Sequence, residues 1–368
     1  TGYPVAFDGT EYIRSGTSTQ PIAKNSQRER RLWEVTKSEA FEDQIAAQWL
    51  TAEETLAMLD GEHAGLARGV ARRDYVLWLG SGISLDRIVG VRAKDGREFR
   101  APIVVAADGN SSRIALAMGL EKNKLRPMGV AARAYFRAPS GDSDFLASCL
   151  ELWDGEPGAS NLLPGYAWMF PLGNGLINVG LGTVNSTATS QKLNVRKQLE
   201  TWLHGSTPRQ WGLTPENQVG GIGSAALPMS FNRKPAYTRG LLLVGDAAGM
   251  VSPFNGEGIP YALEAAEMAA DAIADAHGRG YGSRAAEKAL IGYRSRLESE
   301  WGGYYRLGTI FVKLIGSPTV MRLCTTYGLP RRNLMVLVHK LLANLTDAHR
   351  GDAYDRLINT LSRMAPAA

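Results

Sequence analysis

Two short apolar runs of strand length occur along the chain, and each one ends in an acid with small neighbours. Residues 103–107 read I-V-V-A-A and lead into Asp108-Gly109, and residues 241–244 read L-L-L-V and lead into Gly245-Asp246. Runs that are apolar throughout are typical of parallel strands buried on both faces. Because ligands of open α/β sheets bind beyond the carboxyl ends of the strands, the pattern predicts a ligand site near both acids. An Asp-Gly pair alone is also an ordinary turn signal.

The residues after Asp246 predict a helix that begins at this ligand site. Residues 257–274 carry apolar side chains at helical spacing. The N-terminus of such a helix offers free N–H groups and the positive end of the helix dipole to a negative ligand. The predicted apolar stripe consists of Ile259, Leu263, Ala266, Ala270 and Ile273.

Between the two acid-terminated strands the pattern changes to alternation. Residues 129–138 alternate small or apolar with polar side chains, and two apolar runs flank Asn174-Gly175 within 166–184. Both residues of that pair tolerate the positive φ of a type I′ turn, so they predict a β-hairpin. The sequence therefore predicts a β-rich domain that forms one wall of a substrate pocket.

Three aromatic residues lie at alternate positions of the first hairpin strand. At period two Tyr166, Trp168 and Phe170 share one face, which gives an aromatic wall with two polar tips. A sheet core would show the same stripe. The position of the stripe between the two acid-terminated strands favours a pocket wall.

The last part of the chain, 301–368, is predicted to be helical and is strongly basic. It holds nine Lys or Arg and three Asp, for a net charge of +6 against +5 for the whole chain. Docking on an anionic membrane surface and a solvated basic face over an ordinary core are both compatible with this composition. Its predicted apolar stripe comprises Leu334, Leu337, Val338, Leu341, Leu342 and Leu345.

Length and composition narrow the class of protein. A chain of 368 residues with 44% hydrophobic residues is expected to form two or three structural units. Cys149 and Cys324 are far apart and the five histidines are scattered, so we expect no disulfide framework and no metal, and a reducing compartment. No apolar run reaches the length of a spanning helix, and no nucleic-acid-reading motif accompanies the basic residues.

The motifs together resemble one flavoprotein family. A-D-G-x-x-S (107–112), the first flavin motif, and G-D-A-A-G followed by P-x-x-G-E-G-I (245–259), the second flavin motif, are similar to motifs of the geranylgeranyl reductase family, FAD enzymes with the p-hydroxybenzoate-hydroxylase fold. Y-x-W-x-F-P (166–171) resembles the motif that lines the prenyl tunnel in that family, and aromatic hydroxylases normally lack it. The resemblance runs from about residue 35, where 35–49 looks like a family helix, and is closest to actinobacterial members that act on menaquinone.

The resemblance implies roles for particular residues. Asp246 would hold the ribityl chain of FAD, and Tyr166 is the candidate proton donor, with water an equal alternative. Substrate contacts are implied for Tyr166, Trp168, Phe170 and Pro171. Cofactor contacts are implied for Asp108, Gly109, Gly245, Asp246, Ala247, Pro253, Gly256, Gly258 and Ile259.

The sequence also departs from the family pattern. No G-x-G-x-x-G occurs upstream of Asp108, and the early cysteine-glycine motif near the flavin is absent. We expect that the numbering begins inside the natural protein, with a divergent N-terminus as the alternative, and the affinity of this chain for FAD is in question.

The resulting hypothesis is an FAD-dependent reductase that saturates isoprenoid double bonds of a prenyl lipid, either a menaquinone side chain or a geranylgeranyl group. NAD(P)H or another reductant would reduce the flavin. A flavin-dependent aromatic monooxygenase and a non-enzymatic prenyl-lipid carrier remain alternatives. The expected localisation is cytoplasmic, peripheral on the inner face of the cell membrane, and the oligomeric state stays open.

The expected fold is mixed α/β. A Rossmann-like FAD-binding domain without its G-x-G-x-x-G unit would contain an inserted antiparallel substrate domain and be followed by a helical region. The expected parts are 1–120 and 235–300 for the FAD-binding domain, 121–234 for the β-rich domain and 301–368 for the helical region.

Overall fold

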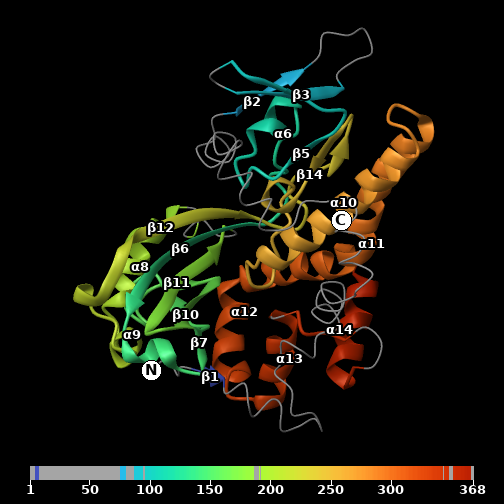
Figure 1. Ribbon diagram of the computed structural model, residues 1–368. Coiled ribbons are helices and arrows are strands. Elements are labelled where there is room, and N and C mark those ends of the chain that lie inside the picture. The colour runs from blue at the N-terminus through green and yellow to red at the C-terminus, as the bar shows by residue number, and fades with distance from the viewer. Residues whose placement is uncertain are drawn as a thin grey trace.

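The fold places a large antiparallel sheet beside a group of C-terminal helices, with smaller sheets and a long helix above them (Figure 1). The segment 35–49, which resembles a family helix, lies outside the described residues. The computed structural model describes residues 5–7, 75–79, 87–93, 96–185, 190, 192–342, 344–347 and 351–365.

The two acid-terminated apolar runs form neighbouring parallel strands, as their composition predicts. β5 (Val104–Ala106) pairs with β14 (Leu241–Leu243) in parallel register. Every residue of β14 is buried, but the prediction of burial on both faces is wrong for β5, where Val105 is 44% exposed. Parallel pairing puts the carboxyl ends of both strands at one edge of the sheet. β13 (Tyr237–Thr238) adds an antiparallel edge to β14. A separate antiparallel sheet contains β2 (Tyr75–Leu79), β3 (Ile88–Ala93) and β4 (Glu98–Arg100).

Two long helices cover this part of the molecule. α10 (Ile259–Gly278) and α11 (Arg284–Ile315) pack against each other and share a core with β14. The prediction of a helix after Asp246 is confirmed, but the predicted stripe is wrong as a core face, because Ile259 is 77% exposed and Leu263 is 59% exposed. The face of α10 that is buried consists of Tyr261, Glu264, Ala265, Met268, Ala269, Ala272 and Ala276.

The large sheet has six strands in the order β1-β7-β10-β11-β6-β12, and every pairing is antiparallel. The predicted hairpin is confirmed: β10 and β11 are joined at Asn174 (φ 54°) and Gly175 (φ 68°), the left-handed conformation that this turn requires. The strands are β1 (Val5–Phe7), β6 (Met128–Arg137), β7 (Leu146–Cys149), β10 (Gly165–Gly173), β11 (Leu176–Val184) and β12 (Gln218–Pro228).

Short elements complete this sheet region. α8 (Val195–Leu203) packs over the sheet and buries Leu199 in its core, together with side chains from β6, β10 and β11. β8 pairs with β9 in a two-stranded sheet. The remaining short elements here are β8 (Leu152–Trp153), β9 (Leu162–Leu163), α9 (Ser206–Gln210), η2 (Pro139–Asp142) and η3 (Pro215–Asn217).

The C-terminal region is helical, as predicted. α11 runs unbroken across residue 300, where the sequence analysis places a boundary. None of the described helices is by itself long and apolar enough to span a membrane. α11 and the segment Pro318–Gly328 together have that length and apolarity, but they are bent by 90° relative to each other. After α11 come α12 (Pro318–Leu323), the π-helical turn η5 (Cys324–Gly328), α13 (Arg332–Leu342) and α14 (Ala353–Met364).

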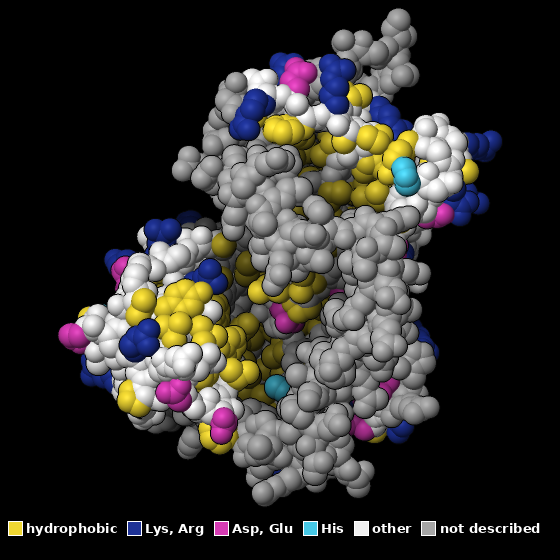
Figure 2. Space-filling view, viewed as in Figure 1, with side chains coloured by type: hydrophobic (Ala, Val, Ile, Leu, Met, Phe, Trp, Pro, Cys, Tyr) yellow, Lys and Arg dark blue, Asp and Glu magenta, His cyan; other side chains and the backbone are white. Residues whose placement is uncertain are grey.

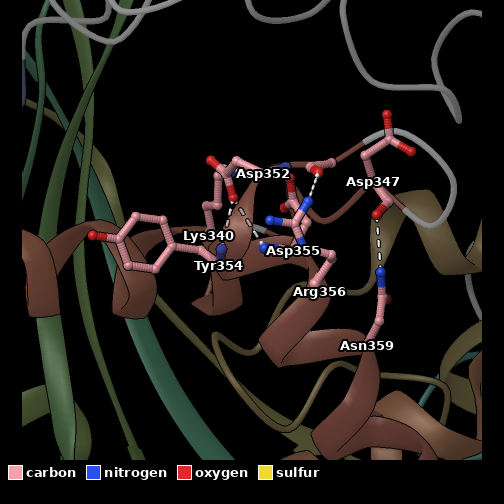
Figure 3. Close-up of polar contacts among 8 residues, drawn as sticks. Lys340, Asp347, Asp352, Tyr354, Asp355, Arg356 and Asn359 are labelled. Carbon is pink, nitrogen blue, oxygen red and sulfur yellow. Dashed lines mark hydrogen bonds and ion pairs between the residues drawn. The ribbon is translucent and has the colours of Figure 1, made fainter.

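A buried ion pair ties α14 to α13. Lys340 Nζ donates hydrogen bonds of 2.8 Å to both Asp352 and Asp355 (Figure 3). The side chains of Lys340 and Asp355 are only 9% and 4% exposed. Burial lowers the pKa of Lys340, but the hydrogen bonds to the two carboxylates outweigh it and leave the pKa raised. Burial alone would raise the pKa of Asp352. The hydrogen bonds that Asp352 accepts and the positive charge of Lys340 together have a larger effect, so the pKa of Asp352 is lowered.

Replacing Lys340 with Met is expected to destabilise the protein by about 2 kcal/mol, since a buried carboxylate loses its charged partner. The lowered pKa of Asp352 means that its contribution is lost as pH falls through that pKa. The raised pKa of Lys340 means that its contribution is lost as pH rises through it. Thermal unfolding across pH measures both effects. An unchanged melting temperature for the variant near neutral pH would contradict the assignment.

Candidate functional site

A cavity of about 1110 Å³ lies between the large sheet, the loop after β14 and the C-terminal helices. Its walls are mainly apolar, and Figure 2 shows hydrophobic side chains gathered in the hollow beside the sheet. One end is bordered by the second flavin motif, one side by the aromatic strand β10, and the other side by α11, α12, η5 and α13. The sequence predicted the first two of these walls.

Asp246 borders the cavity at the end of β14. It lies in the 3₁₀ turn η4 (Gly245–Ala247) and is half-buried. A Cβ on Gly258 would lie 3.2 Å from Asp246 Oδ1, a tight contact, so the absence of a side chain at Gly258 eases the close approach of the start of α10 to the carboxylate. Burial raises the pKa of Asp246, and the positive charge of Lys122 opposes the shift. The site thus holds a poorly solvated carboxylate beside a helix N-terminus.

The N-terminus of α10 also borders the cavity. Gly258 is its N-cap residue and provides no side chain to accept a hydrogen bond from the first turn. The first N–H groups of the helix are therefore available to a ligand, together with the positive end of the dipole. Of the residues predicted to contact the cofactor, Pro253, Gly256, Gly258 and Ile259 border the cavity, whereas Gly245 and Ala247 are buried and do not border it.

Asp108 lies at the same sheet edge as Asp246 but does not border the cavity. Its Oδ2 accepts a hydrogen bond from the Ile114 N–H at 3.4 Å, and its Oδ1 is buried without a hydrogen-bond partner among the described residues. Ser112 caps α6 (Arg113–Ala117) by accepting from the Ala115 N–H, and Gly109 has a positive φ of 74°. The motif therefore forms a strand-turn-helix with one unsatisfied carboxylate oxygen.

Two basic residues near these acids were missed by the sequence analysis. Arg233 is 2% exposed and donates a hydrogen bond of 2.9 Å to the Ala247 carbonyl, so it supports the turn that carries Asp246. Burial lowers the pKa of Lys122, and the nearby Arg233 lowers it further. Neither residue belongs to a recognisable motif. Backbone hydrogen bonds from 230–233 to the loop 248–251 after β14, and from Asn123 to Asn232, bring them here.

The aromatic wall is formed as predicted. Tyr166, Trp168 and Phe170 all border the cavity, with ring centroids 5.8 Å apart for the first pair and 6.1 Å for the second. Trp168 Nε1 donates to Asn178 Oδ1 at 3.1 Å, which fixes the orientation of the indole. Pro171 does not border the cavity, so the predicted substrate contact of this residue is not supported by the geometry.

Tyr166 joins the aromatic wall to the second flavin motif. Its hydroxyl donates a hydrogen bond of 2.6 Å to the carbonyl of Asn255. Burial, with a contribution from Glu257, raises the pKa of Tyr166 to about 12. The proton of Tyr166 is held by a backbone acceptor and is hard to remove. The geometry therefore favours a positioning role for Tyr166 over the predicted role of proton donor.

Glycines on β11 make room for Trp168. A Cβ on Gly180 would lie 2.3 Å from Trp168 Cζ2 and 2.5 Å from the Ala132 carbonyl oxygen, closer than packed atoms can approach. The indole thus lies directly on the glycine backbone of the neighbouring strand.

The Gly180→Ala variant is expected to push the indole of Trp168 towards the cavity and to lower stability by about 1–3 kcal/mol, as overpacking does. Tryptophan fluorescence and thermal unfolding measure the two effects. Gly223→Ala is the matched control, because a Cβ on Gly223, also on the sheet and at the cavity, would meet nothing within 4 Å. Equal behaviour of the two variants would show that Gly180 does not position Trp168.

The helical wall of the cavity was only partly foreseen. Leu334, Val338 and Leu342 of the predicted C-terminal stripe border the cavity at i, i+4 and i+8 of α13. Leu337 and Leu341 are half-buried but do not border it. The other apolar side chains of this wall are Phe311, Ile315, Met321, Leu329 and Met335. Over the residues that the structure describes, no group of His, Cys, Asp or Glu could hold a metal ion.

Comparisons with known proteins identify relatives. The menaquinone reductase of Mycobacterium tuberculosis is 34% identical over 208 residues, which are 53% of this chain and 50% of that protein. The menaquinone reductase of Mycolicibacterium smegmatis is 28% identical over 277 residues, which are 75% and 64%. The digeranylgeranylglycerophospholipid reductase 1 of Methanopyrus kandleri is 35% identical over 196 residues, which are 52% and 48%. No family model matches the chain.

A solved structure shares the fold. The geranylgeranyl bacteriochlorophyll reductase-like protein of Thermoplasma acidophilum superposes with a TM-score of 0.50 at 18% identity, covering 73% of this chain and 67% of that one. The chain spans about half to two thirds of the length of its curated relatives. These relatives confirm the resemblance to the geranylgeranyl reductase family that the flavin motifs and the aromatic motif indicate.

Proposed function

We propose that this protein is an FAD-dependent reductase that saturates an isoprenoid double bond of a prenyl lipid, either a menaquinone side chain or a geranylgeranyl group. One observation carries the proposal: a single apolar cavity joins the second flavin motif to the aromatic wall and to a helical wall. The named activities of the relatives, menaquinone reductase and digeranylgeranylglycerophospholipid reductase, support the same substrate class.

The described residues fit the flavin half of this proposal. The Asp108 carboxylate has a buried oxygen without a partner among the described residues, and the N-terminus of α10 is uncapped beside Asp246. Asp246, Gly258 and Ile259 would hold the ring end of FAD, and Asp108 with Gly109 would lie towards its diphosphate. When bound, FAD supplies the two-electron reduction of the alkene. The proposed reductant of the flavin is NAD(P)H or another electron donor.

The contribution of the chain is to orient the substrate and to exclude water. A prenyl chain lies well in a cavity that is bordered mainly by apolar side chains, because burying its methyl branches there removes apolar surface from water. Trp168 and Phe170 would hold the reacting segment flat against the sheet side. The hydrogen bond from Tyr166 to Asn255 fixes the aromatic wall relative to the loop that precedes α10. Water is the proposed source of the proton, because the Tyr166 hydroxyl is engaged.

The proposed localisation is at the cytoplasmic face of the membrane, as a peripheral protein. Prenyl lipids reside in the bilayer, so an enzyme that acts on them must meet its surface. The excess of basic residues in 301–368 supports this placement.

Anaerobic flavin spectroscopy tests the proposed function. The protein is loaded with FAD, reduced with dithionite and mixed with a geranylgeranyl lipid that has no quinone ring. Return of the oxidised flavin spectrum is expected with this lipid and not with its fully saturated counterpart, since only an alkene can accept the electrons. Equal rates with both lipids would contradict the proposal.

A further inference from the structure

The apolar cavity reaches the protein surface at one corner of the C-terminal helices. We define the portal corner as residues 322–334, which comprise the end of α12, the π-turn η5 and the start of α13. Cys324 and Leu334 border the cavity and are also exposed, with Leu334 41% exposed. These two side chains therefore place this part of the cavity wall at the protein surface.

Large apolar side chains lie at this part of the surface. Leu323 is 54% exposed and Tyr327 is 58% exposed, and their spacing of four residues puts them on one side of the α12–η5 segment. A Cβ on Gly328 would lie 3.5 Å from Leu334 Cδ2, so the start of α13 packs directly against this segment. Contiguous exposed apolar side chains of this kind mark interaction surfaces. Tyrosine has an apolar ring and a polar hydroxyl, and it is enriched at the membrane–water interface for this reason.

The charged side chains of the portal corner itself are all positive. Arg322, Arg331 and Arg332 are exposed, and none of them forms an ion pair with another residue that the structure describes. The sequence from 301 to 346 contains no acidic residue at all. A surface that combines apolar side chains with unopposed arginines is complementary to an anionic lipid surface.

We propose that the portal corner docks on an anionic lipid bilayer and is the opening through which a prenyl lipid enters the cavity. Leu323, Tyr327 and Leu334 would reach between the lipid headgroups, with the three arginines on the phosphates around them. The entry role rests on the proposed function, whereas the docking itself does not. Because Cys324 stands at the rim, it lies at the depth where protein and bilayer meet.

A fluorophore on Cys324 tests the docking directly. Cys324 is exposed, whereas burial raises the pKa of Cys149 to about 11, so a thiol-reactive NBD dye selects Cys324 near neutral pH. On mixing with vesicles of phosphatidylglycerol and phosphatidylcholine, the NBD emission is expected to shift to the blue and to be quenched by doxyl-labelled lipids. Pure phosphatidylcholine vesicles are expected to give a much smaller shift.

The matched control places the same dye at the other end of α11. Tyr281 is exposed in the turn before α11, which has 32 residues and is therefore about 48 Å long. The Tyr281→Cys/Cys324→Ser variant is expected to bind vesicles without any spectral shift. No shift at Cys324, or an equal shift at both positions, would overturn the proposal.

Charge variants separate the portal corner from the net charge of the protein. Arg331→Gln/Arg332→Gln is expected to weaken sedimentation with the anionic vesicles by an order of magnitude or more, at about fivefold per arginine. Arg284→Gln/Lys288→Gln removes the same charge at the far end of α11 and is expected to have little effect. Equal weakening by both pairs would contradict a specific docking corner. Neither readout requires flavin or turnover, so docking without alkene reduction would reject the proposed function alone.

Discussion

The Trp168→Ala variant is expected to lose about a hundredfold in the rate of alkene reduction while it retains flavin. The indole borders the cavity and stacks on Phe170 at 6.1 Å, and it is fixed by its hydrogen bond to Asn178. Its removal opens a gap beside the reacting segment of the lipid. A reacting group that is misplaced can react about a hundredfold more slowly through the loss of orientation alone. Rates of alkene reduction at saturating FAD measure the effect.

Two further variants distinguish this role from a general loss of stability. Trp168→Phe keeps an aromatic ring against Gly180 and is expected to lose much less than Trp168→Ala. Trp211→Ala removes a half-buried indole that lies against the sheet core and does not border the cavity. It is expected to lower stability and to leave the rate per folded molecule unchanged. If both Trp→Ala variants lowered the rate equally, the aromatic wall would have no special part in catalysis.

The Asp246→Ala variant is expected to weaken flavin retention by about 1.5–3 kcal/mol, the usual loss for a hydrogen bond to a charged group. The raised pKa of Asp246 shows that its burial works against the ionised form. For an acid with a raised pKa, ionisation costs stability at any pH above that pKa. The variant should therefore bind FAD less tightly while the flavin-free protein is as stable as the unmodified protein or more so.

This opposite response of binding and stability identifies a ligand-binding acid. Equilibrium dialysis of FAD and thermal unfolding of the flavin-free protein measure the two quantities. Asp271→Ala is the control, because Asp271 is an exposed acid on α10 that pairs with Arg296. It is expected to change neither quantity substantially. Unchanged flavin retention in Asp246→Ala would remove Asp246 from the site.

Features with strong local signals could be predicted from the sequence. The apolar runs before Asp108 and Asp246 predicted a parallel pair of strands, and β5 and β14 form that pair. Burial on both faces holds for β14 alone, because Val105 of β5 is 44% exposed. Asn174-Gly175 set the hairpin, and the period of two placed Tyr166, Trp168 and Phe170 on one face. Each of these features depends on residues close together in the chain.

The buried face of α10 could not be predicted by spacing. This helix is rich in alanine and carries small or apolar side chains on more than one side, so periodicity alone does not select a face. Tertiary packing decides, because Tyr261 meets Trp301 and Tyr305 of α11 with ring centroids 5.2 and 5.4 Å apart. The exposed Ile259 then becomes available to the cavity instead of the core.

The charged surroundings of the site depend on long-range contacts as well. Arg233 donates a hydrogen bond to the Ala247 carbonyl. The positive charge of Lys122 acts to lower the pKa of Asp246, although the two residues are 124 positions apart in the sequence. In the sequence, the basic excess of 301–368 is a single property of the whole region. In the fold these basic residues differ in their surroundings, because Lys340 forms a buried ion pair, whereas Arg331 and Arg332 are exposed.

Mass spectrometry of the lipid product tests the central claim most directly. The FAD-loaded protein is incubated with reductant and with menaquinone or a geranylgeranyl lipid, and the side chain of the product is analysed. The prenyl-reductase proposal predicts a gain of two hydrogens in the isoprenoid chain, lost in Trp168→Ala and kept in Trp211→Ala. A gain of one oxygen, or an unchanged chain in every prenyl lipid when flavin is bound and reduced, would contradict it.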